Sequence, residues 1–62
     1  MNLLEVGLDK TPDENMLSYN NFVKEIDNGI CRLSYKDKQY KVLGVAFVKS
    51  QLRVILDLDD YI

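Results

Sequence analysis

Few side chains in this 62-residue chain are of the types that perform chemistry in proteins. It contains no His, so the usual general base near neutral pH and the commonest metal ligand are both missing. Its only cysteine, Cys31, has no second thiol for a disulfide or a zinc site and no His to activate it. Because Cys31 lies in an alternating apolar segment, we interpret it as a small core residue.

Three carboxylates near the C-terminus, Asp57, Asp59 and Asp60, are the remaining candidates for metal chemistry. A calcium loop needs more oxygen ligands and a glycine-bearing turn in one short stretch, which this segment lacks. A solvated strand end is the simpler interpretation, and a surface for a basic partner is a lesser alternative. We therefore predict no enzyme, and no catalytic, cofactor-binding or metal-binding residues.

A helix is the most clearly signalled element that would position a surface. Thr11 fits an N-cap, Pro12 the first helical position and Glu14 the capping-box position. Apolar residues then recur at three- and four-residue spacing, which places them on one stripe facing a core. The members of this stripe are Met16, Tyr19, Phe22, Val23 and Ile26. Asn28-Gly29 ends the helix, because glycine readily takes the left-handed conformation found after helix C-termini.

After the helix, the pattern changes to that of β-strands. The segments that fit strands are residues 30–35, 40–48 and 52–58. Two-residue turns are expected at Asp37-Lys38 and Lys49-Ser50. Residues 3–8 form either a first strand, which we favour, or an irregular lead-in. The fold class is therefore α+β, with one helix packed on a three- to four-stranded antiparallel sheet (β-α-β-β-β or α-β-β-β), and residues 1–62 form a single domain.

Large apolar side chains occupy both faces of the expected sheet. Residues 42–48 are apolar at both alternations, although Gly44 among them suggests a bulge, a bend or a close backbone approach. A lone helix of about four turns covers only one face. The other face then needs either a curled sheet that closes over its own core or a partner. We favour a homodimer, with a different protein as the other occupant. The candidate interface residues are Leu43, Val45, Phe47, Val54 and Leu56.

The net charge of −2 conceals two regions of opposite sign. Residues 30–53 hold six basic residues and one acid, which gives +5, and the remainder holds two basic residues and nine acids, which gives −7. Lysines that guard strand edges explain the basic segment most simply. Alternatively, Tyr35 and Tyr40, expected as neighbours across the hairpin, stack on bases while lysines contact phosphates. The candidate contacts to nucleic acid or to an acidic partner are Arg32, Tyr35, Lys36, Lys38, Tyr40 and Lys41.

The composition is that of an ordinary globular domain, with 47% hydrophobic and 29% charged residues. No apolar run approaches the ~20 residues that span a bilayer, and the N-terminus does not resemble a signal peptide. We expect a cytoplasmic, non-enzymatic binding or regulatory protein that acts through a protein–protein interface. A regulator or inhibitor encoded by a phage or mobile element fits these properties. A nucleic-acid-binding module formed by the Tyr/Lys hairpin at residues 30–53 is the alternative.

Overall fold

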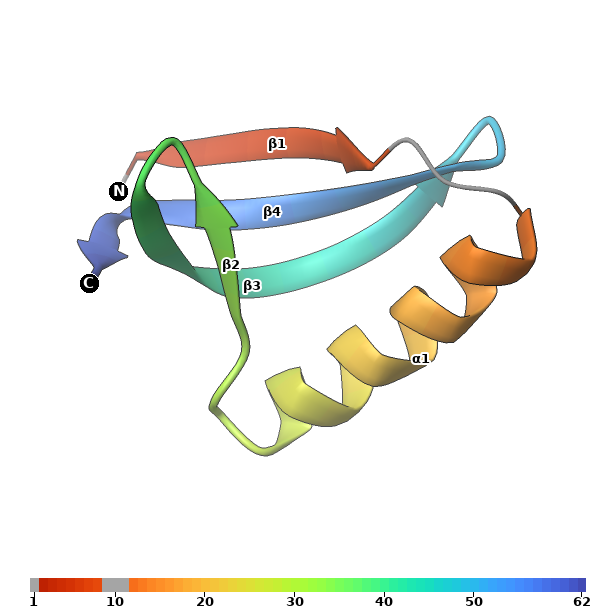
Figure 1. The fold of residues 1–62 in the computed structure, drawn as a ribbon, viewed down its shortest axis with the longest axis horizontal. Coiled ribbons are helices and arrows are strands. Elements are labelled where there is room, and N and C mark those ends of the chain that lie inside the picture. Colours follow the sequence, from red (N-terminus) through yellow and green to blue (C-terminus); the bar gives the residue numbers. More distant parts are fainter. Residues whose placement is uncertain (1, 9–11) are drawn as a thin grey trace.

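A computed structural model describes residues 2–8 and 12–62, in which one helix packs against a four-stranded antiparallel sheet (Figure 1). The elements follow in the order β1 (Leu3–Leu8), α1 (Pro12–Asp27), β2 (Arg32–Tyr35), β3 (Lys38–Val48) and β4 (Gln51–Tyr61). The predicted α+β class and the order β-α-β-β-β are confirmed, and the N-terminal segment is a strand. The order of strands in the sheet is β1-β4-β3-β2, so β1 and β2 form its two edges.

The C-terminus of α1 is fixed by a glycine in the left-handed conformation. Gly29 has a φ of +72°. Its N–H donates to the carbonyl of Ile26 at 3.0 Å, and the N–H of Ile30 donates to the carbonyl of Glu25 at 3.1 Å. These two bonds form a Schellman motif, which satisfies the last carbonyls of the helix. The predicted end of the helix is confirmed, whereas the predicted N-cap, Thr11, lies outside the described residues.

One stripe of α1 faces the sheet, but it is narrower than predicted. Its members are Tyr19, Phe22 and Ile26, all of them partly buried. Met16 and Val23 remain 55% and 36% exposed. The reason is the position of the helix, which packs mainly against β3 and less against β4 (Figure 1). The sheet is therefore covered at its centre, whereas α1 does not extend over β1.

Two tight turns set the register of the sheet. The turn between β3 and β4 is at Lys49-Ser50, as predicted, with φ values of +50° and +67°. The turn between β2 and β3 is at Lys36-Asp37, one residue earlier than predicted, with φ values of +47° and +70°. Two consecutive positive φ values are typical of type I′ turns, whose twist matches that of the strands they join.

A register shift in β3 gathers the core on one face of the sheet. The shift lies between Val42 and Gly44 and confirms the bulge that Gly44 suggested. An extra residue in one strand reverses which face the following side chains occupy. The shift therefore explains why both the even-numbered and the odd-numbered residues of 42–48 are apolar: the core-facing positions change from even to odd within this segment. Among the described residues, the buried apolar residues are Cys31, Val42, Leu52, Val54 and Leu56.

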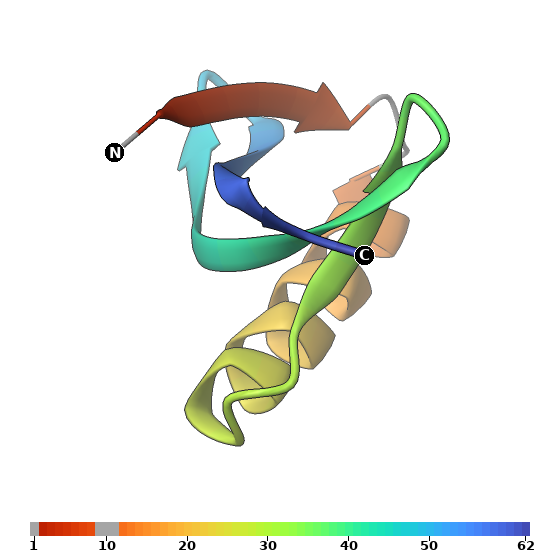
Figure 2. The same ribbon diagram turned by 90° about the vertical axis from the view of Figure 1, so that its left-hand side faces the viewer.

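The sheet curls around this core without closing into a barrel. β3 bends sharply near its middle, where its ladder with β4 carries two register shifts (Figure 2). Bulges bend and twist strands in this way. Among the described residues, β1 and β2 pair on one side only, so each leaves a free edge.

Candidate binding surfaces

The predicted interface residues divide between the core and the surface. Val54 and Leu56 have 0% of their area exposed, and Val45 packs against the same cluster. These three residues belong to the core of the subunit, because Phe22 and Ile26 of α1 pack against the same cluster. They are therefore reassigned from a partner-facing surface to the core. Leu43 and Phe47 remain 37% and 40% exposed.

The face of the sheet opposite α1, here called the outer face, is mixed in character. It carries two carboxylates, one guanidinium, one ammonium, one amide, two glycines and four aliphatic side chains. Its members by register are Leu3, Glu5, Gly7, Lys41, Gly44, Ala46, Val48, Gln51, Arg53, Ile55 and Asp57. The expected second face of large apolar side chains is thus replaced by one with few of them.

Within the described residues, the outer edge of β1 presents backbone groups that pair with no other strand. The N–H of Leu58 donates to the carbonyl of Asn2 at 2.9 Å, across the ladder of β1 with β4. In an antiparallel ladder, alternate residues turn both backbone groups to the same neighbour. Leu4 and every second residue after it therefore bond to β4. The residues whose N–H and C=O groups point to the open edge are Leu3, Glu5 and Gly7.

A half-exposed apolar row runs along β1 on the side of the helix. Leu4, Val6 and Leu8 pack against the core cluster but are only partly buried. They are partly buried because α1 covers the centre of the sheet and not this strand. Sequence analysis did not single out this edge. Residues 3–8 contain no Lys, Arg or Pro, the residues that protect edge strands from pairing. Their absence indicates an open edge only once β1 is known to lie at the edge of the sheet.

Arg53 and Gln51 lie beside Gly7 on the outer face. Gly7 is directly opposite Arg53 in the register. A Cβ atom on Gly7 would come within 2.6 Å of the Gln51 Nε2 atom, so the Gln51 amide lies over the glycine. The Arg53 Nε atom is buried and forms no hydrogen bond within the described part of the chain. A buried group of a cationic side chain without a partner is costly in free energy.

The aromatic residues of the basic hairpin contact one another. The rings of Tyr35 and Tyr40 lie 6.5 Å apart, which confirms them as neighbours. Tyr40 also contacts Tyr61, at 5.8 Å in an edge-on arrangement. The Lys38 Nζ atom lies 4.1 Å from the centre of the Tyr61 ring, and the Lys36 Nζ atom lies 5.4 Å from that of Tyr35. These lysines therefore interact with rings of their own chain.

The remaining charged candidates differ in whether they have partners. Arg32 forms an ion pair with Asp60 at 2.7 Å and also donates to the carbonyls of Gln39 and Asp60. Lys41 is exposed and lies opposite Arg32 in the ladder. Arg32 is therefore a structural residue that ties β2 to β4. Of the sequence-predicted contacts, Lys36, Lys38 and Lys41 are exposed, and Tyr61 is an exposed residue that the prediction missed.

The C-terminal carboxylates are part of a strand and bind within the chain. β4 continues to Tyr61, beyond the predicted end at residue 58. Asp59 accepts hydrogen bonds from the backbone N–H and the side-chain amide of Asn2. Asp57 accepts one from the N–H of Asp59, at 2.9 Å. Among the residues that the structure describes, no group of three or more acids or thiols is arranged to hold a metal ion.

Cys31 and Glu25 form a polar contact at the edge of the core. Cys31 is 3% exposed. Burial, together with a hydrogen bond to the Glu25 carboxylate and the negative charge of that group, raises the pKa of the Cys31 thiol to about 11. A thiol with a raised pKa is a poor nucleophile near neutral pH, because little of it is thiolate. Cys31 therefore acts as a core residue.

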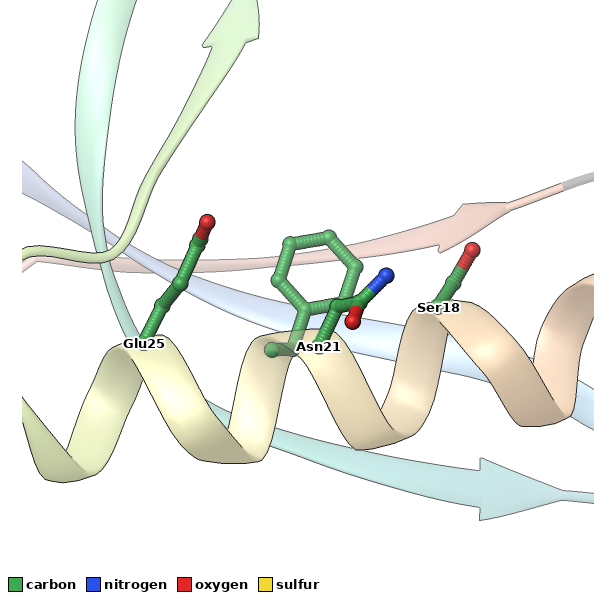
Figure 3. Close-up of a pocket in the computed structure, with 4 residues that line it drawn as sticks. Ser18, Asn21 and Glu25 are labelled. Atoms are coloured by element: carbon green, nitrogen blue, oxygen red, sulfur yellow. The ribbon is translucent and has the colours of Figure 1, made fainter.

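A cavity of about 220 Å³ lies along α1, lined by Ser18, Asn21, Phe22 and Glu25. Figure 3 shows the side chains of Ser18, Asn21 and Glu25 on the same side of the helix. Cavities that enclose small molecules measure roughly 300–1,000 Å³ and draw their walls from several elements. This one is smaller and its lining comes from one helix, so we assign it no ligand.

Comparison with protein-family models, curated proteins and solved structures finds no match to this chain. Within the described residues, the helix is too short and too polar to cross a membrane. Among the described residues, the free edge of β1 brings together outward backbone groups, the half-exposed apolar row and, on the neighbouring strand β4, Arg53 with its buried Nε atom.

Proposed function

We propose that this chain is a small, non-enzymatic, cytoplasmic binding protein that acts through a protein–protein interface at the free edge of β1. The observation that carries the proposal is the edge itself, where outward backbone groups lie beside the half-exposed apolar row of Leu4, Val6 and Leu8. An extended segment of a partner would add to the sheet as a further strand. Backbone hydrogen bonds give such a complex its affinity, and alternate side chains give it specificity.

A comparison of the two edges supports β1 as the interface. Soluble proteins protect edge strands with short length, lysines and prolines, because open edges pair with other chains. β2 has four residues, begins with Arg32 and ends beside Lys36. β1 has six residues and contains no Lys, Arg or Pro. By this criterion, β2 is protected and β1 is open.

Proline at position 5 tests the edge without breaking the native ladder. The N–H of Glu5 points away from β4, so Glu5→Pro removes a donor that the subunit does not use. The matched control, Glu5→Ala, removes the carboxylate and keeps the N–H. Each tagged variant is purified from the native host, and co-purifying proteins, including untagged copies of this chain, are identified by mass spectrometry. We expect the wild type and Glu5→Ala to retain a partner that Glu5→Pro loses.

Circular dichroism and thermal unfolding establish that both variants are folded. The proposal fails if folded Glu5→Pro retains the same partners as the wild type. It also fails if none of the three proteins retains a partner at micromolar concentration.

The basic hairpin supports a second candidate function, the binding of single-stranded nucleic acid. The observation in its favour is Tyr61, which is 52% exposed beside the exposed lysines of the β2–β3 turn. We rank it lower because Arg32 is bound to Asp60 and Tyr35 and Tyr40 pack against the core. It predicts binding to a fluorescent oligonucleotide that weakens steeply with salt and with Tyr61→Ala. No binding at low salt removes this candidate.

A further inference from the structure

We infer that the partner strand at the β1 edge is β1 of a second copy of this chain, paired antiparallel about Val6. In this arrangement Val6 faces Val6 of the second copy, and Glu5 faces its Gly7. The inference rests on the proposed function of the edge and adds the identity and register of the occupant. A two-fold axis perpendicular to the sheet would join the two copies into one eight-stranded sheet, with both helices on the same face.

The charges along β1 discriminate between the symmetric registers. Pairing about Glu5 places the two Glu5 carboxylates directly opposite each other, which is destabilising. Pairing about Leu4 places Glu5 opposite Leu3 of the second copy, whose neighbour in the ladder is the acidic Asp57. Pairing about Val6 places Glu5 opposite Gly7, whose neighbour is Arg53. Among these three registers, pairing about Val6 alone brings opposite charges together.

The outer face around Gly7 is suited to receive that carboxylate. Adjacent strands lie about 4.8 Å apart, so Glu5 of the second copy would be about 10 Å from the Arg53 backbone, with only Gly7 between them. The long side chains of Arg53 and Glu5 span this distance beside the Gln51 amide, since Gly7 adds no side chain of its own. The Gln51 amide, which lies over Gly7, adds a second donor. Pairing would therefore bring a carboxylate to Arg53, whose Nε atom is buried and forms no hydrogen bond within the described residues.

The opposite face of the seam is complementary as well. In the register about Val6, the outward backbone groups of Glu5 and Gly7 bond to those of the second copy, at two symmetric places. Leu4 then faces Leu8 of the second copy on the helix side, and the two Val6 side chains meet at the axis. The half-exposed apolar rows of both copies thus become one. The five buried apolar residues in the described part of the chain are few for a stable subunit, and dimerisation adds to that core.

Single cysteines at the seam test the register. Val6 faces itself only in the inferred register, as a non-hydrogen-bonded pair with Cα atoms about 4.5 Å apart, within the range of a disulfide. Under mild oxidation, we expect Val6→Cys to form a disulfide-linked dimer, whereas Leu4→Cys and Leu8→Cys remain monomeric on non-reducing gels. The native Cys31 is present in all three variants and is buried, so it serves as a common background. Cross-linking through Leu4→Cys instead would overturn the register.

Charge reversal tests the contact between Glu5 and Arg53, with dimerisation followed by sedimentation equilibrium. We expect Glu5→Arg or Arg53→Glu to weaken the dimer at least about 10-fold and the double variant to recover most of that loss. Asp27→Arg, a matched reversal on an exposed helical residue, should leave the dimer unchanged. If Arg53→Glu does not fold, Glu5→Gln replaces it and should weaken the dimer without affecting thermal unfolding.

The outcomes separate this inference from the proposed function. A wild-type protein that stays monomeric up to about 100 µM overturns the inference. If the wild type is monomeric but captures a different protein, and Glu5→Pro abolishes that capture, the edge is still the interface. Only the inference that a second copy of this chain binds there is then wrong. If the wild type dimerises and Glu5→Pro dimerises equally well, both are wrong.

Discussion

At the scale of single residues, the molecule holds its cysteine in the neutral form. Cys31 lies under the core cluster and donates to Glu25, and its pKa rises from 9.0 to about 11. The native state therefore binds the thiol proton more tightly than the unfolded chain does. The stabilisation from this proton is fully present below pH 9 and disappears as the pH rises from 9 to about 11.

This environment predicts slow alkylation of Cys31. At pH 8 the raised pKa lowers the thiolate fraction about 100-fold relative to the unfolded chain, and burial slows the reagent further. We expect iodoacetamide to modify the native protein at least about 100-fold more slowly than the protein in urea. Glu25→Gln, which removes an acceptor and a negative charge, should increase the native rate. Equal rates in native buffer and in urea would contradict this description of Cys31.

The sequence predicts the role of a single side chain such as Cys31 better than it predicts which residues share one surface. Cys31 was recognised as a core residue because a lone thiol without His has few other roles. Val54 and Leu56 lie on the face of the sheet that α1 covers, and alternation along the chain does not show which of two apolar faces a helix covers. Glu5 and Gly7 were missed because their significance depends on the neighbours of β1 in the sheet.

At the scale of elements, substitution of two glycines that both have open space around them should change the free energy of unfolding in opposite directions. A Cβ atom meets nothing within 4 Å at either Gly29 or Gly44. Gly29 has a φ of +72° at the end of α1, whereas Gly44 is not among the residues with positive φ. The left-handed conformation costs an ordinary residue roughly 1–2 kcal/mol, and removing a glycine elsewhere reduces the entropy of the unfolded chain.

We therefore expect Gly29→Ala to lower the free energy of unfolding by about 1 kcal/mol. Gly44→Ala should raise it by about 0.5 kcal/mol. Urea denaturation of the two variants beside the wild type gives both values. If the two substitutions destabilise the protein equally, the Schellman motif is not what ends the helix.

The elements themselves were largely predictable because their signals are local. The start of α1 at Pro12, its end at Gly29, and the turn at Lys49-Ser50 each follow from two or three neighbouring residues. The turn at Lys36-Asp37 was placed one residue late, because the polar run of residues 36–39 offers several equivalent turns. β4 was ended too early, at its acidic residues, because its extension relies on distant partners such as Asn2 and Arg32.

At the scale of the whole molecule, one helix covers a curled sheet at its centre and leaves β1 uncovered. The expected surplus of apolar surface turned out smaller than alternation suggested, because the bulge in β3 collects most of it in one core. What remains is a strand with free backbone groups and a half-exposed row on the helix side. The case for a partner therefore moves from the face of the sheet to its edge.

Hydrogen exchange of the β1 amides, followed by NMR, tests this claim most directly. The amides of Leu4, Val6 and Leu8 bond to β4 and should exchange slowly at every protein concentration. The amides of Glu5 and Gly7 should exchange rapidly in dilute protein and slowly once the protein is concentrated or bound to its partner. If these two amides exchange rapidly in the associated state, the interface lies elsewhere and the account is wrong.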